Sequence, residues 1–250
     1  MLQADREAEI VRAVRRSGPV SVDDLSQLLG VSASTVRRDL NRLNGEGTLE
    51  RIRGGARISD DADNLHPFSS VAVTDKVEKL DVARRAASLV EDGAIVLLDI
   101  GTTTASLAEQ LRGRRLTVIT ASLAVYEILR NEAGIELILL GGVVRRSYQS
   151  MVGQLTTSAL GQVRADITFL GTSGVRANGD VLDSTPSEVP VKCSLMRAAE
   201  RSVLVADEHK FPGSGAFKVC SLSDVGTLVS NADIPRQTRQ YCDEHGVEVL

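Results

Sequence analysis

Cysteine is scarce in this sequence, and the spacing of the three cysteines excludes several kinds of site. Cys193, Cys220 and Cys242 are widely separated, they form no C-x-x-C motif, and no histidine stands at metal-ligand spacing from them. We therefore expect free thiols packed in the core, with no metal site and no cofactor.

Long apolar runs are also missing. No segment approaches the roughly 18 consecutive apolar residues of a membrane span, and the N-terminal segment MLQADREAEIVRAV is too polar for a signal peptide. The 42% hydrophobic and 25% charged residues are ordinary for a soluble protein. We expect a cytoplasmic protein with no membrane partner, long enough for a small domain followed by a larger one.

The sequence has fewer basic than acidic residues overall, but its basic residues are in excess near the N-terminus. The net charge is −4, yet residues 1–57 carry ten arginines against eight acidic residues, a net of +2. Residues 58–250 carry nineteen basic against twenty-five acidic residues, a net of −6. This asymmetry indicates a small nucleic-acid-binding module attached to a larger acidic domain.

The segment 31–43 has the pattern of a helix that reads DNA. Val36, Leu40 and Leu43 recur at helical spacing and predict an apolar face, and Ser32 is placed to cap a helix that begins next to it. The opposite face carries hydrogen-bond donors, namely Ser34, Thr35, Arg37, Arg38, Asn41 and Arg42. Because such donors match guanine edges and phosphates, we expect this face to lie in the major groove of double-stranded operator DNA.

Neighbouring elements complete a winged helix-turn-helix. Helices are predicted over 4–17 and 22–29, and a short turn that contains Gly30 separates the second of them from the reading helix. Apolar residues around Gly54-Gly55 then predict a two-stranded wing. The wing carries three arginines placed to reach phosphates or the minor groove: Arg51, Arg53 and Arg57. A generic three-helix motif with a solvated charged face is the plainer interpretation, but the ordered set of elements favours DNA binding.

Beyond residue 58 the pattern changes twice. Residues 59–74 mix acidic residues, proline and serine without helical periodicity, which predicts a hinge between a DNA-binding domain at 1–58 and an effector domain at 75–250. In the second domain helical patterns alternate with buried strands, which are predicted at 94–98, 116–119, 135–140, 167–170, 203–205 and 228–229. We expect an α/β fold with an open, largely parallel sheet covered by helices on both faces, and such sheets bind ligands at the carboxyl ends of their strands.

Glycine-rich and polar turns follow the predicted strands, at the edge where a ligand is expected. They contain Asp99, Gly101, Thr102, Thr103, Thr104, Ser122, Gly142, Arg145, Gly171, Thr172 and Lys210. Glycine admits close backbone approach, while hydroxyls, N–H groups and cations suit a phosphate. The turn after the first strand is neither a Walker loop nor G-x-G-x-x-G, so a nucleotide is not indicated. Taken alone, its threonines are equally well explained as helix caps.

Two stretches of the first domain carry a family resemblance. TVRRDLNRL followed by EGTLERIRGGA resembles the helix-turn-helix of the DeoR family of bacterial transcription regulators, over residues 6–57. The segment Thr35 to Leu40 matches the T-V/I-R-R-D-L pattern of that family. Asp39 is the one acidic residue on the reading helix, and we expect it to pair with a neighbouring arginine rather than to contact a base.

The second domain resembles the sensor domain of the same family, which is similar to ribose-5-phosphate isomerase and CoA transferase folds and binds phosphorylated sugars or related intermediates. The matches are D-x-G-T-T from Asp99, a pair at Gly141-Gly142, D-x-x-F-x-G-x-x-G from Asp166, E-x-x-x-K from Glu188 to Lys192 and D-x-x-K-F from Asp207. This resemblance adds Glu188 to the expected effector-binding residues. Ala121 and Glu208-His209 depart from the family pattern, which leaves room for a less common ligand.

Together these features predict a transcriptional repressor of a carbohydrate-utilisation operon, controlled by a phosphorylated sugar or related metabolite. Paired reading helices must meet half-sites about one helical turn apart or a multiple of it, so we expect a homodimer or homotetramer. One alternative is a sugar-phosphate isomerase-like enzyme with an appended DNA-binding module, in which Glu188, Asp166 and Lys210 form the acid–base set. Another alternative is a DNA-organising protein without a ligand.

Overall fold

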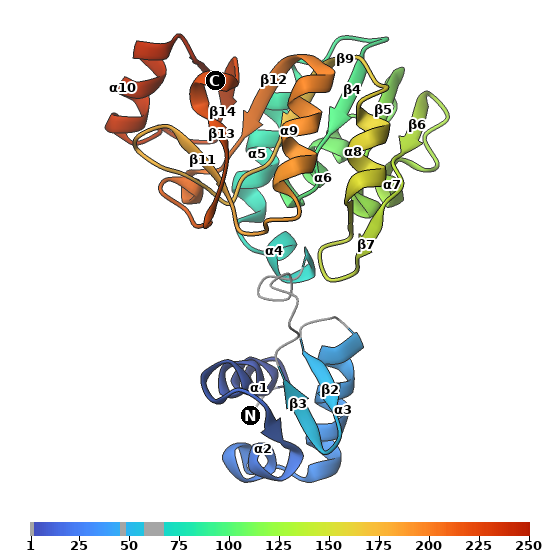
Figure 1. Cartoon of the computed structure of the whole chain (residues 1–250), viewed down its shortest axis with the longest axis vertical. Coiled ribbons are helices and arrows are strands. Elements are labelled where there is room, and N and C mark those ends of the chain that lie inside the picture. Colours follow the sequence, from blue (N-terminus) through green and yellow to red (C-terminus); the bar gives the residue numbers. More distant parts are fainter. Residues whose placement is uncertain (1–2, 46–48, 58–67) are drawn as a thin grey trace. The chain divides into compact units, whose positions relative to one another are not determined.

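The structure, a computed structural model, describes residues 3–45, 49–57 and 68–250 and divides into two compact units (Figure 1). The first unit extends to Val71 and includes the loop Arg146–Tyr148, and the second contains Ala72–Arg145 and Gln149–Leu250. The boundary expected at residue 58 and residues 59–67 of the hinge expected at 59–74 lie outside the described residues. Along the described residues, no helix combines the length and the apolarity that crossing a bilayer requires.

Three helices and a small sheet form the part of the first unit described by residues 3–45 and 49–57, which confirms the predicted winged helix-turn-helix. The elements are α1 (Gln3–Ser17), α2 (Val22–Leu29), α3 (Ala33–Gly45), β1 (Val20–Ser21), β2 (Glu50–Ile52) and β3 (Gly55–Arg57). The strands are antiparallel in the order β1-β3-β2. Ile10, Leu25 and Leu40, one from each helix, are fully buried in a common core. The apolar periodicity therefore acts as predicted, because each helix turns one stripe inward.

Side-chain and glycine caps fix the ends of the helices in this unit. The Ser21 hydroxyl accepts a hydrogen bond from the Asp24 N–H at 3.0 Å and begins α2. Gly30 ends α2 in the left-handed conformation, with φ 63°. The Ser32 hydroxyl accepts a hydrogen bond from the Thr35 N–H at 3.2 Å, which confirms the predicted start of α3.

The second unit is built around a seven-stranded sheet with the order β15-β14-β12-β9-β4-β5-β6, in which every neighbouring pair is parallel. The strands are β4 (Ile95–Leu98), β5 (Leu116–Thr120), β6 (Ile135–Leu139), β9 (Ala165–Leu170), β12 (Ala199–Val205), β14 (Thr227–Val229) and β15 (Glu248–Val249). Val96, Val118 and Phe169 are among the fully buried residues of the core. Runs of this kind fit strands that are covered on both faces.

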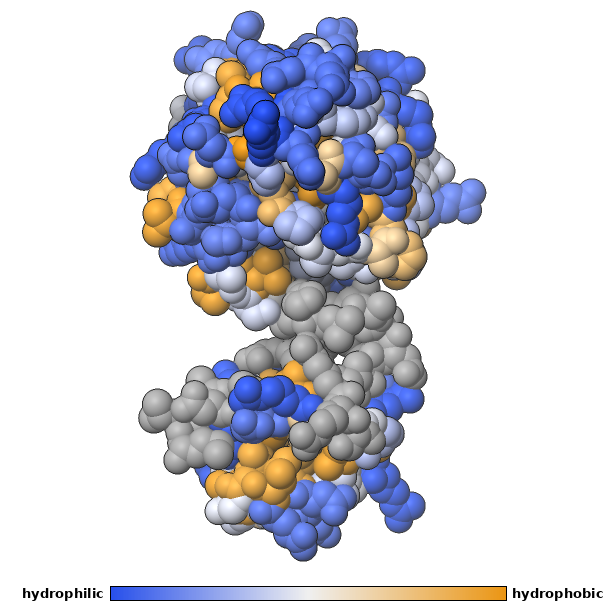
Figure 2. Space-filling view, turned by 90° about the vertical axis from the view of Figure 1, so that its left-hand side faces the viewer, coloured by the Kyte–Doolittle hydropathy of each residue, from blue (hydrophilic) through white to orange (hydrophobic). Residues whose placement is uncertain are grey.

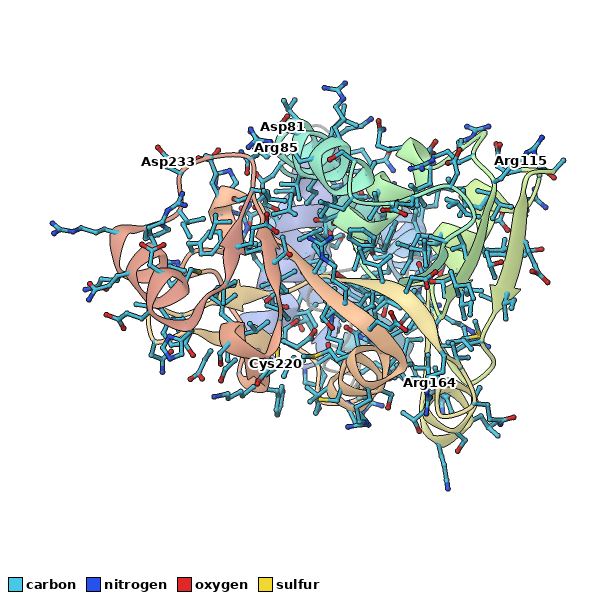
Figure 3. All side chains as sticks on the ribbon, turned by 90° about the horizontal axis from the view of Figure 1, so that it is seen from above. Asp81, Arg85, Arg115, Arg164, Cys220 and Asp233 are labelled. Atoms are coloured by element: carbon cyan, nitrogen blue, oxygen red, sulfur yellow. The ribbon has the colours of Figure 1, made fainter. Side chains whose placement is uncertain are left out.

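Helices cover both faces of this sheet, as Figure 3 shows from above. One face carries α5 (Lys76–Ala87), α6 (Thr102–Gln110) and α7 (Leu123–Leu129), and the other carries α8 (Gln154–Leu160) and α9 (Val189–Ala198). A further helix, α10 (Arg236–His245), precedes the last strand. The fold class predicted from the sequence is therefore confirmed.

Several elements of the second unit lie where no element was predicted. Among them are the helices α8 and α9, the antiparallel hairpin of β7 (Val143–Arg145) and β8 (Ser150–Val152), and the antiparallel sheet of β10 (Gly174–Val175), β11 (Asp180–Asp183) and β13 (Phe217–Ser221). Short strands such as these carry too few residues for a clear alternating pattern.

The end of the segment 59–74, where the sequence shows no helical periodicity, forms the short helix α4 (Phe68–Val73). The Phe68 N–H donates to the Ser147 carbonyl at 2.9 Å, and the Phe68 ring meets the Tyr148 ring edge-on at 6.0 Å. These contacts reach across the sequence, so the local pattern does not contain them.

The three cysteines are free thiols. Cys220 and Cys242 are buried as predicted, whereas Cys193 is half-buried. Burial raises the pKa of Cys220 to about 12, so this thiol is a packing group and not a reactive thiolate.

Candidate DNA-reading face and ligand site

The exposed face of α3 presents Ser34, Arg37, Arg38 and Asn41 to solvent. Thr35 is half-buried, and its hydroxyl lies 3.0 Å from that of Ser32. The inward face of the helix is fixed by the core residues described above. The structure therefore keeps most of the predicted donors on one accessible surface, as a helix in a major groove requires.

Two side chains of α3 join it to α1. Asp39 accepts two hydrogen bonds from the Arg6 guanidinium, at 2.6 and 3.0 Å, so it pairs with an arginine as predicted. Arg42 donates to the buried Glu7 carboxylate, with its Nε 2.7 Å from Glu7 Oε1. Arg42 was placed among the DNA contacts from sequence, yet its guanidinium holds α3 against α1 in this structure.

The wing supports the reading face as well as extending it. The backbone N–H of Arg51 donates a hydrogen bond to Asn44 Oδ1 at 2.8 Å. The Arg51 guanidinium donates a second hydrogen bond to Asn41 Oδ1 at 2.7 Å. It thereby orients a predicted DNA contact on α3. Arg57 pairs with Glu50 at 2.9 Å, while Arg53 is exposed at the tip of the wing.

A buried ion pair lies at the carboxyl ends of β4 and β9. The Lys192 ammonium, from α9, donates to Asp99 Oδ2 and to the Gly171 carbonyl, the latter at 2.9 Å. Asp99 Oδ2 also accepts the Gly171 N–H at 3.0 Å. Burial raises the pKa of Asp99, and the positive charge of Lys192 opposes that shift. Asp99 Oδ1 has no hydrogen-bond partner among the described residues, so one buried oxygen at this edge is left for a donor.

A second buried ion pair joins Arg145, on β7, to Glu188, at the start of α9. The Arg145 guanidinium also donates to the Thr185 hydroxyl at 3.3 Å. The Thr185 N–H donates to Asp183 Oδ1 at 2.9 Å, and Asp183 Oδ2 lies 3.5 Å from the Lys192 ammonium. The two ion pairs are therefore linked in one buried network, which we call the charged network: Asp99, Arg145, Asp183, Thr185, Glu188 and Lys192.

The predicted threonine turn begins α6 beside this network. Thr102, Thr103 and Thr104 are buried in the first turn of the helix, where backbone N–H groups have no partner within the helix. The Thr104 hydroxyl donates to the Gly101 carbonyl at 3.0 Å, so its local role is to shape the turn.

Other predicted effector residues have structural roles of their own. Ser122 caps α7 by accepting the Val125 N–H at 3.2 Å, and Thr172 donates to the Leu182 carbonyl at 2.8 Å. A Cβ on Gly142 would lie 2.2 Å from the Thr156 hydroxyl and 2.7 Å from the Val152 carbonyl oxygen. Close packing therefore explains Gly142 without a ligand.

Lys210 follows β12, in a short 3-10 helix (Glu208–Lys210) capped by Asp207. It lies close enough to Lys79, on α5, to lower the pKa of that buried lysine, although burial itself is the larger cause. Lys79 also donates to the Thr74 carbonyl at 2.5 Å. Lys210 therefore lies near a second cation, Lys79, which was not predicted from the sequence as part of the site.

Carboxylates also gather near this helix. Ligand atoms of Glu78, Glu208 and His209 lie within 4.8 Å of one another, with Glu208 and His209 exposed. His209 also stands 3.5 Å from Asp75.

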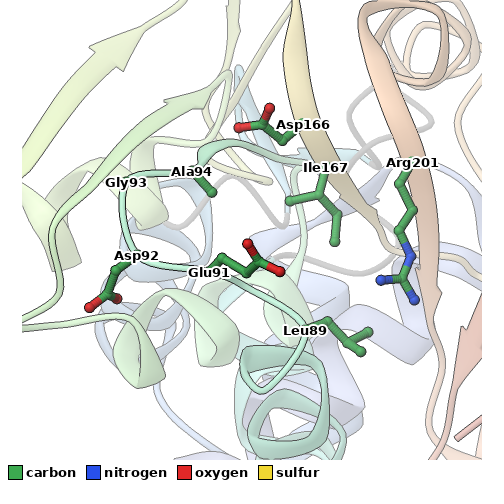
Figure 4. A pocket seen from close by; sticks show the side chains of 8 residues that line it. All are labelled: Leu89, Glu91, Asp92, Gly93, Ala94, Asp166, Ile167 and Arg201. Carbon is green, nitrogen blue, oxygen red and sulfur yellow. The ribbon is translucent and has the colours of Figure 1, made fainter.

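The acid–base set of the isomerase alternative does not assemble. Asp166 lies near the amino end of β9, where it accepts the Ile95 N–H at 2.7 Å. It lines a cavity of about 400 Å³ together with Glu91, Asp92 and Arg201 (Figure 4). Four residues of extended strand, about 13 Å, separate Asp166 from the carboxyl edge of the sheet, where the charged network with Glu188 lies. Three carboxylates against one arginine make this cavity a poor phosphate site.

Several residues of the site were missed in the predicted set. Lys192 matches a family motif but was not among the expected ligand contacts, and Asp183 and Thr185 lie in segments without a predicted element. Their common signal is a polar residue beside a short apolar run, which is too frequent in sequences to single them out.

The fold and these two sites define a class of protein, a regulator that joins a DNA-reading domain to a ligand sensor. Residues 6–62 match the DeoR-like helix-turn-helix domain, and residues 74–232 match the DeoR C terminal sensor domain. The chain therefore belongs to the DeoR family of transcriptional regulators.

Curated relatives match along nearly the whole chain. The glycerol-3-phosphate regulon repressor of Haemophilus influenzae is 31% identical over 251 residues, covering 100% of this chain and 97% of the relative. The repressor of the same name from Escherichia coli K12 is 30% identical over 250 residues, covering 100% and 99%. The L-fucose operon activator of Haemophilus influenzae is 28% identical over 242 residues, covering 97% of each.

Solved structures match the fold more distantly. The eIF2B beta structure from Chaetomium thermophilum has a TM-score of 0.48 at 17% identity and covers 68% of this chain and 54% of that one. Ribose 5-phosphate isomerase A from Methanocaldococcus jannaschii has a TM-score of 0.42 at 20% identity and covers 55% of each chain. The chain spans about half the length of these two structures.

Proposed function

We propose that this chain represses a carbohydrate-utilisation operon and that a phosphorylated sugar or related metabolite controls it from the charged network. The observation that carries the proposal is this buried network at the carboxyl edge of the sheet, in the same chain as an arginine-bearing reading helix. Two repressors of a glycerol-3-phosphate regulon among the relatives support the ligand class and the direction of control.

The residues at the carboxyl edge of the parallel sheet suit both the phosphate and the sugar hydroxyls of such a ligand. A phosphate fits the first turn of α6, because the N–H groups of Thr102, Thr103 and Thr104 and the positive end of the helix dipole point at it. Sugar hydroxyls fit the unpartnered oxygen of Asp99 and the carboxylate of Glu188. No cofactor enters this proposal.

Control then follows from preferential binding. A ligand that re-pairs Lys192 or Arg145 binds one arrangement of the network better than another, and only this difference shifts the population of states. The state favoured by the ligand sets how strongly the reading helices hold operator DNA.

The experiment that tests this proposal measures DNA binding and ligand binding on the same protein. Fluorescence anisotropy on duplexes from the gene's own neighbourhood reports operator affinity, and thermal unfolding with a panel of phosphorylated and unphosphorylated sugars reports the ligand. A ligand at a hundred times its dissociation constant stabilises the folded chain by about 2.7 kcal/mol. Failure of every phosphorylated sugar to change either readout would refute the assignment.

A further inference from the structure

A second group of polar side chains lies after β12, and the proposed function gives it no role. Glu208 and His209 depart from the family pattern, and both are exposed. Their ligand atoms and a carboxylate oxygen of Glu78, from the first turn of α5, all lie within 4.8 Å of one another. Two elements that are distant in sequence therefore bring one imidazole and two carboxylates together.

The exposure of these side chains is not in itself a signal. Hydrophilic residues dominate the flank of the second unit that Figure 2 shows, and exposed polar groups are ordinary on a protein surface. The signal is the combination of donors, because an imidazole nitrogen and carboxylate oxygens together bind divalent transition metals. The cysteine spacing argues against a thiolate site, and this group contains no thiol.

The spacing of the ligand atoms fits a metal ion after small rotations of the side chains. Atoms bound tetrahedrally at about 2.1 Å from an ion lie about 3.4 Å from one another. Because Glu208 and His209 are exposed, their side chains can turn toward Glu78 without repacking the core.

Neighbouring side chains already hold two of the three ligands. The Asn231 amide donates to Glu208 Oε1 at 3.2 Å, and its oxygen accepts the Glu208 N–H at 2.9 Å. Asp75 Oδ1 lies 3.5 Å from His209 Nε2. Hydrogen-bonded carboxylates and a carboxylate beside an imidazole are the usual surroundings of metal ligands, because they orient the donor atoms.

A buried carboxylate next to the group adds negative charge. Asp207 is fully buried, its Oδ1 accepts the His209 N–H at 3.1 Å, and its Oδ2 has no hydrogen-bond partner among the described residues. Four carboxylates and two ammonium groups gather in this region, namely Asp75, Glu78, Asp207 and Glu208 with Lys79 and Lys210. The excess of two negative charges matches the charge of a divalent cation.

We propose that Glu78, Glu208 and His209 bind a divalent transition-metal ion, for which Zn²⁺ is the probe. The ion joins the first turn of α5 to the loop after β12 and adds positive charge near Asp207. Neither the reading helix nor the charged network supplies a ligand, so the proposal stands or falls separately from the sugar-phosphate assignment.

Isothermal titration of the untagged full chain with Zn²⁺ tests the proposal. We expect one ion per chain, bound with a micromolar dissociation constant. His209→Ala and Glu78→Gln each remove one ligand, and each is expected to weaken binding at least tenfold. Circular dichroism of both variants stays that of the wild type, because neither side chain belongs to the core.

His245→Ala is the matched control, because His245 is an exposed histidine of α10 whose ring stacks on Tyr241. It keeps the full affinity, and so does Cys193→Ser, which removes a half-buried thiol that could also bind Zn²⁺. A wild type that binds no Zn²⁺ at hundreds of micromolar overturns the proposal. So does binding that both His209→Ala and Glu78→Gln leave intact, or binding that either control variant removes.

Discussion

Lys192 and Asp99 form the buried ion pair on which the proposed ligand site depends. Both are almost fully buried, and a buried charge is costly unless its partner is present. Burial raises the pKa of Asp99, whereas the ammonium of Lys192 favours its charged form. The pair therefore suits the ligand site proposed above, because a bound molecule that re-paired either charge would change the energy of the whole network.

Lys192→Met removes the opposing charge, so the pKa of Asp99 rises further. We expect a loss of about 3–5 kcal/mol in the free energy of unfolding at neutral pH. A carboxyl whose pKa is higher in the folded chain holds more protons there than in the unfolded chain, so stability falls as pH rises from about 3.9 through the folded value. Urea unfolding across this range measures the slope.

The double variant Asp99→Asn with Lys192→Met is the control for that slope. Without the Asp99 carboxyl, the part of the extra pH dependence that comes from Asp99 disappears and part of the stability returns, while the Asp183 carboxylate, which also faces Lys192, remains. A slope that persists in the double variant would assign it to other groups.

Arg38 is an exposed cation on the reading helix and one of the predicted DNA contacts. Arg38→Ala is expected to weaken operator binding by about 1–3 kcal/mol if it reads a base. If it contacts a phosphate instead, the slope of log affinity against log salt becomes shallower by about 0.9. Anisotropy titrations at several salt concentrations separate these outcomes. Arg12→Ala changes an exposed arginine of α1 that is paired with Glu9. We expect this control to leave the operator affinity and the slope against salt unchanged.

At the scale of elements, the β7–β8 hairpin is fitted closely to α8. Gly142→Ala brings a Cβ into the Thr156 hydroxyl and the Val152 carbonyl, and we expect a loss of about 1–3 kcal/mol from overpacking. Gly141→Ala meets no atom within 4 Å, so its effect stays within about 0.5 kcal/mol. Chemical denaturation of the two variants makes the comparison, and equal costs would show that the hairpin adapts.

The elements also show what a sequence can and cannot predict. The parallel strands and α3 were predictable, because buried runs such as 95–98 and the spacing of Val36 and Leu40 are local patterns. Helix α4 and the pairing of Arg42 with Glu7 were not, since each depends on a partner distant in sequence. In the site, glycines and threonines after strands could be found, whereas Asp183 needed the fold to bring it to Lys192.

At the scale of the whole molecule, one loop links the charged network to the segment before the sensor sheet. Arg145 ends β7 in the second unit, and the next residues, Arg146–Tyr148, group with the first unit. There Ser147 and Tyr148 contact Phe68 at the start of α4. The ion pair of Arg145 and the contacts with Phe68 are thus only two to three residues apart along the chain, and we expect this loop to couple them.

Phe68→Ala tests that coupling, because it removes the ring contact with Tyr148 but touches neither the reading face nor the charged network. We expect operator affinity and ligand affinity, each measured alone, to stay near their wild-type values. The change in operator affinity caused by ligand, about 5–150-fold for a typical coupling of 1–3 kcal/mol, falls toward unity. Phe217→Ala, on β13, is the matched control and keeps the full response. If Phe68→Ala also kept it, the signal would have to leave the charged network by another route, since Arg145 would no longer act through this contact.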